Sequence, residues 1–62
     1  MRFEEALKAM REGKKCRVAR LSPNYLFLVN GEFFVNDGLY NLPIGHIKTE
    51  YILSDDWEVV DE

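Results

Sequence analysis

Cysteine and histidine are almost missing from this sequence, which contains one of each, Cys16 and His46. A single cysteine cannot form a disulfide within the chain, and a lone thiol fits a reducing cytoplasm better than secretion. Neither residue has a second cysteine or histidine near it, so the spacing of a zinc site is also lacking. We therefore expect a cytoplasmic protein that holds no metal, no cofactor and no disulfide.

Long apolar runs are absent as well. None approaches the ~20 residues that span a bilayer, and the N-terminus lacks the apolar segment of a secretory signal. The net charge of −3 argues against direct binding to nucleic-acid polymers, which depends on many phosphate contacts from lysine and arginine. These absences predict a soluble protein with no membrane and no nucleic-acid polymer among its partners.

The chain is also short, and its 62 residues are interpreted as one domain, 1–62. Chains of this size bury only ~60% of the surface that they expose when unfolded. A core this small rarely contributes more than roughly 3–5 kcal/mol, and small domains usually add disulfides, a metal or subunit association. Because the first two are lacking, we expect a homo-oligomer, either a dimer or a tetramer.

The basic residues are concentrated in one part of the chain. The segment 8–20 carries a net charge of +5, and the rest of the chain carries −8. This asymmetry suits an anionic small ligand or complementary contacts between subunits, and the charges alone leave both open. Six of the eight lysines and arginines lie in this segment: Lys8, Arg11, Lys14, Lys15, Arg17 and Arg20.

A helix is predicted at the start of the chain. Its apolar residues follow the i, i+3, i+4, i+7 spacing of one helix face. Gly13 is placed to end the helix as the residue after its C-cap. The apolar face consists of Phe3, Ala6, Leu7 and Met10.

The clearest signal of a sheet is the Asn30-Gly31 pair between apolar runs at 25–29 and 32–35, which predicts a two-residue β-hairpin. Odd- and even-numbered positions of its strands are both apolar, so both faces of the sheet are expected to be buried against another element. One helix covers one face, and leaving the other in water would forgo on the order of 1.5–3 kcal/mol for each large side chain. We expect a second copy to cover that face, with a ligand site between subunits.

The other elements follow from simpler patterns. Alternating side chains predict a strand at 15–20, whereas 44–54 has no clear period and is interpreted as a loop with one helical turn. Two more strands are predicted, at 39–42 and at 57–60, the second followed by Asp61-Glu62. The fold class is therefore α+β, with a short N-terminal helix packed on a small antiparallel sheet that has a central Asn-Gly hairpin.

The residues that could carry out catalysis are not arranged for it. Cys16 lies at the apolar parity of its strand, where thiols are usually inert, and the adjacent Asp55 and Asp56 would point to opposite faces of a strand. We predict that the protein is not an enzyme. His46, which follows Gly45 in a loop, is either a surface histidine or a donor to a ligand at a subunit seam.

Among the basic residues, Arg20 has the most specific predicted role. Strand parity places it with Cys16 at the end of the strand, beside the loop 22–24. A partly desolvated guanidinium there can bind phosphate through two parallel hydrogen bonds, and the alternative is a structural ion pair. Tyr25 and Tyr40 lie at the ends of elements, and aromatic rings beside an arginine suit a nucleotide.

Three segments carry a family resemblance: the opening MRFEEALKAMREGKK (1–15), the strand YLFLV (25–29) and the closing DDWEVV (55–60). Together they resemble a family of phage and prophage domains whose best-understood members are the Thoeris anti-defence sponge proteins of the second type. The resemblance implies a small α+β homotetramer that binds cyclic ADP-ribose isomers, and in some members cyclic dinucleotides, without hydrolysis. This chain has Leu21-Ser22 where the family has Gly-Trp, and Asn41 where the family has Trp before Leu-Pro.

We therefore predict a non-catalytic phage anti-defence sponge that sequesters cyclic nucleotide immune signals in the cytoplasm of a bacterial host. The alternative is a protein-binding inhibitor whose acidic surface meets a bacterial defence protein such as a nucleic-acid-guided nuclease, and a purely structural module is a third hypothesis. Arg20 is expected to bind phosphate, and Tyr25 and Tyr40 to pack on a base or ribose. The predicted ligand-binding residues are Arg20, Ser22, Asn24, Tyr25, Tyr40, Asn41, Pro43 and Thr49.

Overall fold

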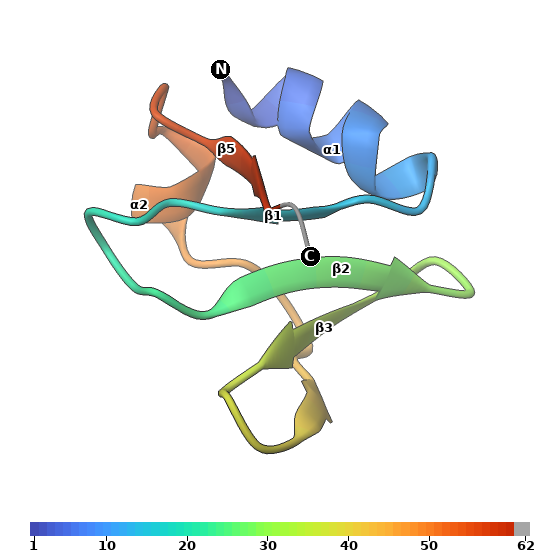
Figure 1. Cartoon of the computed structure of the whole chain (residues 1–62). Coiled ribbons are helices and arrows are strands. Elements are labelled where there is room, and N and C mark those ends of the chain that lie inside the picture. The colour runs from blue at the N-terminus through green and yellow to red at the C-terminus, as the bar shows by residue number, and fades with distance from the viewer. Residues whose placement is uncertain (61–62) are drawn as a thin grey trace.

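The computed structural model describes residues 1–60, and within them it places two helices and five strands. The strands form one sheet in the order β4-β3-β2-β1-β5, with every pair of neighbours antiparallel (Figure 1). The predicted α+β fold class is confirmed, while Asp61 and Glu62 lie outside the described residues. The elements in chain order are α1 (Phe3–Arg11), β1 (Lys15–Arg17), β2 (Tyr25–Val29), β3 (Glu32–Asn36), β4 (Asn41–Pro43), α2 (Thr49–Ile52) and β5 (Glu58–Val60).

α1 begins and ends where the sequence predicts. The side chain of Glu5 accepts a hydrogen bond from the backbone N–H of Arg2 at 3.0 Å, which satisfies one of the free donors at the helix start. After the C-cap residue Glu12, Gly13 has a φ of 92° and donates its N–H to the carbonyl of Met10. The left-handed conformation at Gly13 is the one that glycine adopts most easily. The buried residues of the inner helix face are Ala6, Ala9 and Met10.

The Asn-Gly hairpin is confirmed by the pairing of β2 with β3. Asn30 and Gly31 have φ values of 51° and 79°, the two positive values that a type I′ turn requires. The register pairs Phe27 with Phe34, so both rings lie on one face of the sheet. Leu26, one residue earlier on β2, points to the opposite face and is buried in the core.

The turn between β3 and β4 is held by a carboxylate. Asp37 accepts the backbone N–H groups of Leu39 at 2.9 Å and of Tyr40 at 2.8 Å, and these bonds lower the pKa of its carboxyl group. Because Leu39 and Tyr40 belong to this turn, the strand predicted at 39–42 instead spans Asn41–Pro43. β4 is an edge strand, a position that tolerates Pro43 because one side of the strand needs no N–H donor.

The strand predicted at 15–20 is shorter than expected. β1 ends at Arg17, because the carbonyl of Val18 accepts the N–H groups of Leu21 and Ser22 at 2.9 and 3.0 Å and so begins a turn. Val18 remains fully buried, but Arg20 lies in the turn and not at a strand end. The prediction that Arg20 lies at the end of this strand, on the same side as Cys16, was therefore wrong.

The C-terminal third contains the single helical turn that was predicted, as α2, and the predicted last strand as β5. β5 pairs with β1 at the other edge of the sheet, with Arg17 opposite Glu58. Trp57 precedes β5 instead of opening it. Its backbone N–H donates to the carbonyl of Met1, and the ammonium group of Met1 donates to the carbonyl of Trp57, both at 3.0 Å.

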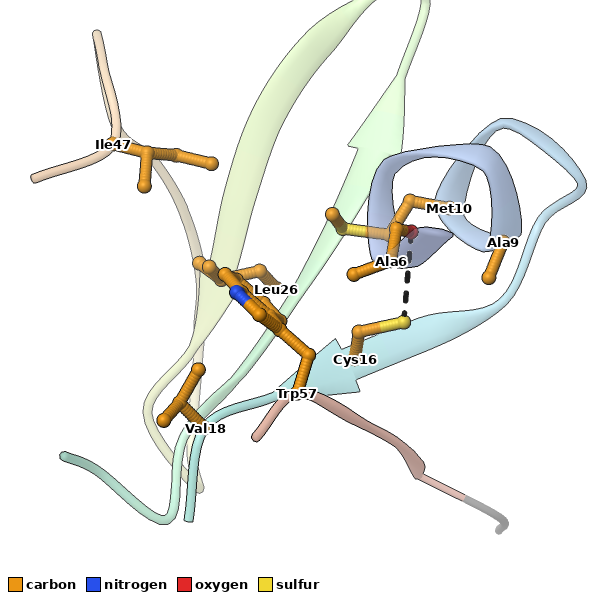
Figure 2. Close-up of a cluster of buried hydrophobic side chains, with 8 residues drawn as sticks. All are labelled: Ala6, Ala9, Met10, Cys16, Val18, Leu26, Ile47 and Trp57. Atoms are coloured by element: carbon orange, nitrogen blue, oxygen red, sulfur yellow. Dashed lines mark hydrogen bonds between the residues drawn. The ribbon is translucent and has the colours of Figure 1, made fainter. Parts of the chain in front are cut away.

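The hydrophobic core lies between α1 and one face of the sheet. Figure 2 shows the side chains from α1, β1 and β2 converging, with the Cys16 thiol directed at the Ala6 carbonyl, to which it donates at 3.8 Å. Apolar residues from the C-terminal third, including Ile44 and Tyr51, pack against the same core. The buried members are Ala6, Ala9, Met10, Cys16, Val18, Leu26, Ile47 and Trp57.

Candidate functional site

A cavity of about 290 Å³ opens between the helix-side face of the sheet and the segment 44–51. Its lining combines apolar side chains with the polar side chains of two segments that are far apart in the sequence, here called its rim. A mostly apolar pocket with a few convergent polar groups is the usual form of a small-molecule site. The lining residues are Ser22, Asn24, Leu26, Val35, Ile44, His46, Ile47, Lys48 and Tyr51.

One side of the rim is formed by the loop that joins β1 to β2. The hydroxyl of Ser22 accepts the backbone N–H of Asn24 at 3.1 Å, which fixes both residues in one local turn. Within residues 1–60, no hydrogen bond joins the Asn24 side-chain amide to another residue. That amide offers a donor and an acceptor to a ligand in the cavity.

The other side of the rim carries the cationic groups. His46 and Lys48 precede α2, and across the described part of the chain neither side chain forms an ion pair or hydrogen bond. Lys48 is an uncompensated positive charge beside an apolar cavity, which favours an anionic group on a bound molecule. Both residues are exposed, so a ligand can reach them.

α2 is held in place by contacts with the residues that follow it. The indole Nε1 of Trp57 donates to the carbonyl of Tyr51 at 2.9 Å, and the hydroxyl of Ser54 donates to the carbonyl of Glu50 at 2.6 Å. Trp57 and Ser54 are both buried. These bonds fix the position of Tyr51, whose side chain lines the cavity.

Arg20 adopts the structural ion pair that the sequence left open. Its Nε and Nη2 donate to the two carboxylate oxygens of Asp56 at 3.0 and 3.2 Å, and Nη2 also donates to the hydroxyl of Ser54 at 3.1 Å. The hydrogen bond between them lowers the pKa of the Asp56 carboxyl group and raises the pKa of the Arg20 guanidinium. The side chain of Arg20 is 60% exposed, not partly desolvated as expected, and it is not part of the cavity lining.

The eight predicted site residues lie in several different parts of the structure. Ser22 and Asn24 line the cavity, and Thr49 is adjacent to the lining residue Lys48. Tyr40 lies in the turn after β3 with 66% of its surface exposed. The remaining residues besides Arg20 lie on the face of the sheet that is turned away from the core: Tyr25, Asn41 and Pro43.

Sequence reasoning missed most of the cavity wall that comes from the C-terminal third. Ile44, Ile47 and Tyr51 recur at i, i+3 and i+7, the spacing of one helix face, although only Tyr51 lies in a helix of the structure. That signal was available but is short and is interrupted by Gly45. Lys48 carried no signal of its own, because a single lysine in a loop is usually a solvated residue.

The face of the sheet turned away from the core, here called the open face, carries an aromatic cluster. The ring centroids of Tyr25 and Phe27 are 6.0 Å apart, and those of Phe27 and Phe34 are 5.8 Å apart. Lys15 Nζ lies 5.1 Å from the centre of the Tyr25 ring. The rings are partly exposed, and Val29 beside them is 40% exposed. The sequence correctly predicted an apolar second face.

A second cavity of about 490 Å³ lies between the end of α1 and the hairpin turn. Arg11 is the one charged residue in its lining, and the other polar lining groups belong to the turn residues Asn30 and Gly31. This cavity lacks the convergent side-chain donors and acceptors of the first one. We therefore take the cavity beside α2 as the candidate site.

The acidic surface proposed for a protein partner is partly neutralised. Asp56 is paired with Arg20, and Glu58 is paired with Arg17 at 3.4 Å. Within residues 1–60, no cluster of three or more histidine, cysteine, aspartate or glutamate side chains could hold a metal ion. Neither helix in this part of the chain has the length and apolar content needed to cross a membrane.

No protein-family model, curated protein or solved structure matches the chain.

Proposed function

We propose that this protein is a non-catalytic binding protein that sequesters a cyclic nucleotide, with a base of the ligand in the cavity beside α2. The observation that carries the proposal is a cavity that combines apolar lining residues with the side chains of Asn24, His46 and Lys48, which have no hydrogen-bond or ion-pair partner within residues 1–60. A nucleotide presents the same combination, a flat ring with hydrogen-bonding edges and an anionic phosphate. Acting in the cytoplasm of a bacterial host, such a protein would be a phage anti-defence sponge that withdraws the signal of an immune effector.

The roles of the rim residues follow from their chemistry. The Asn24 amide would pair with a base edge, because it has both a donor and an acceptor without a partner in residues 1–60. Lys48 and His46 would meet the phosphate, and the Tyr51 ring would pack against the base. Arg20 is not given a phosphate contact in this arrangement, because two of its nitrogens are already bonded to Asp56.

The size of the cavity limits what it can enclose. Its volume of about 290 Å³ is at the lower end of the ~300–1,000 Å³ range of small-molecule sites. We expect one nucleoside unit to be enclosed, with the rest of a cyclic dinucleotide or a cyclic ADP-ribose isomer at the mouth. The lining comes from one chain, so one ligand per chain is expected instead of one ligand between subunits.

Isothermal titration calorimetry with cyclic ADP-ribose isomers and cyclic dinucleotides tests the proposal. We expect saturable binding of at least one of them, and a loss of roughly tenfold or more when Lys48→Glu reverses the charge at the rim, since charge-assisted contacts contribute ~1.5–3 kcal/mol. Lys8→Glu is the matched control, because Lys8 is an exposed lysine on α1 outside the cavity lining. If no ligand of the panel releases heat at micromolar protein, or if both variants weaken binding equally, the proposal is wrong.

We also propose that two copies associate through the open face. A partner on that face would remove the partly exposed rings of Tyr25, Phe27 and Phe34 from water. The exposed area of the chain, 4372 Å², is close to the ~4,200 Å² expected for a folded monomer of this mass. The area alone does not demand a partner, and we therefore expect a reversible equilibrium instead of an obligate oligomer.

Sedimentation velocity over a range of protein concentrations measures this association. We expect the mean mass to rise from that of one chain toward that of two, and Phe34→Lys to keep the protein monomeric by placing a charge on the open face. Leu53→Lys is the control, because Leu53 is equally apolar and is exposed on α2's C-terminal side. A mass of one chain at every concentration, or the same loss of association in both variants, would contradict the proposed interface.

A further inference from the structure

The two sides of the cavity rim belong to segments that the sheet does not hold together. Ser22 and Asn24 lie in the loop between β1 and β2, whereas His46, Lys48 and Tyr51 lie in and before α2. Neither segment is part of a strand pair. The width of the cavity at these residues therefore also depends on contacts outside the strand pairs.

Apolar packing of Leu21, Ile44 and Tyr51 on the shared core supplies part of those contacts, and the hydrogen bonds come from one side chain. Within residues 1–60, the three hydrogen bonds that join the loop 18–24 to the segment 44–56 are all donated by the guanidinium of Arg20. Two of them reach Asp56, and the third reaches the hydroxyl of Ser54. Arg20 lies two residues before Ser22, so these bonds tie one side of the rim to the C-terminal third.

The bond to Ser54 continues to the other side of the rim. Ser54 is buried, and its hydroxyl donates to the carbonyl of Glu50 at 2.6 Å, which leaves an oxygen lone pair to accept the bond from Arg20. Glu50 is the residue before Tyr51 in α2. A chain of two hydrogen bonds thus connects the loop of Ser22 to the helical turn that carries Tyr51.

We propose that Arg20 is a positioning residue that sets the separation of the two sides of the rim, and that it acts through Asp56 and Ser54 without touching the ligand. This inference rests on the proposed ligand site. A planar, forked guanidinium held by a carboxylate and a hydroxyl fixes direction as well as distance, which a lysine cannot do. The bonds from Arg20 to Asp56 and Ser54 are here called the clamp. Without the clamp the two sides of the rim move apart, and only the fraction of molecules with a closed rim binds the ligand.

The effect of Asp56 on ligand affinity separates this role from a direct phosphate contact. If Arg20 were a phosphate ligand, Asp56→Asn would remove a competing carboxylate and a negative charge, and binding of an anion would strengthen. If Arg20 is a clamp, Asp56→Asn and Arg20→Ala both weaken binding, by about tenfold if the closed rim falls to about a tenth of the population. The double variant then loses no more than Arg20→Ala alone, because without the guanidinium residue 56 has no clamp partner left to lose.

Calorimetry with cyclic ADP-ribose as the probe measures these affinities, with Arg11→Ala as the control for loss of a positive charge away from this cavity. Unchanged or tighter binding by Asp56→Asn overturns the clamp and leaves the proposed function standing. The ligand-free protein gives an independent readout, because in Arg20→Ala the NMR amide signals of Ser22, Asn24 and 48–51 should shift while those of the hairpin 25–36 stay in place. Failure of the wild-type protein to bind contradicts the proposed function alone, whereas unchanged signals contradict the clamp.

Discussion

Trp57→Ala is expected to leave the protein largely unfolded at room temperature. Trp57 is 2% exposed, and its ring lies 5.6 Å from the ring of Phe3 and 6.2 Å from that of Tyr51. Truncating a buried tryptophan to alanine costs ~3–5 kcal/mol, which equals the roughly 3–5 kcal/mol that a core of this size supplies. The variant also loses the indole bond to the Tyr51 carbonyl, one of the two hydrogen bonds that side chains within residues 1–60 donate to the backbone of α2.

Circular dichroism during urea unfolding measures this loss. The wild-type chain should unfold in one cooperative transition, and the Trp57→Ala variant should lack a folded baseline. Leu53→Ala is the control, because Leu53 is 78% exposed and its truncation should change the unfolding free energy by no more than about 0.5 kcal/mol. A cooperative transition at the wild-type midpoint in Trp57→Ala would show that the core does not depend on this ring.

The parts of the fold that local chemistry determines could be predicted from the sequence. Asn30 and Gly31 are the residues that accept positive φ in a two-residue turn, and Gly13 ends α1 for the same reason. The alternation of β2 and β3 also revealed an apolar second face, on which the rings of Phe27 and Phe34 meet. Each of these features depends on residues that are close in the sequence.

The parts that were missed depend on distant partners. Arg20 is paired with Asp56, 36 positions away, and no periodicity of the sequence could indicate that contact. β1 ends early because the Val18 carbonyl accepts the N–H groups of a following turn. The alternation of side chains along 15–20 does not indicate that turn. The candidate site was predicted least completely, because one side of its rim, including Lys48, comes from the segment 44–54, which has no clear hydrophobic period. Ser22 and Asn24 were predicted because turn residues beside an arginine suggested a ligand.

Cys16 should react with thiol reagents only when the protein opens. The side chain is completely buried and donates to the Ala6 carbonyl, and burial raises the pKa of the thiol. The thiolate is the reactive form, so a raised pKa and exclusion from water both suppress labelling. If opening requires global unfolding at roughly 3–5 kcal/mol, labelling should be slower than in the unfolded chain by about two to four orders of magnitude.

Labelling with 5,5′-dithiobis(2-nitrobenzoic acid) can therefore report both stability and ligand binding. The rate in buffer is compared with the rate in concentrated urea, and Trp57→Ala should react nearly as fast in buffer as the unfolded wild-type chain. A ligand that binds the folded state alone, present at 100 times its Kd, should slow the reaction a further ~100-fold, because it stabilises the folded state by ~2.7 kcal/mol. Fast labelling of a protein that retains its circular dichroism would mean that the sheet opens locally at β1, and Cys16 would then be accessible without unfolding.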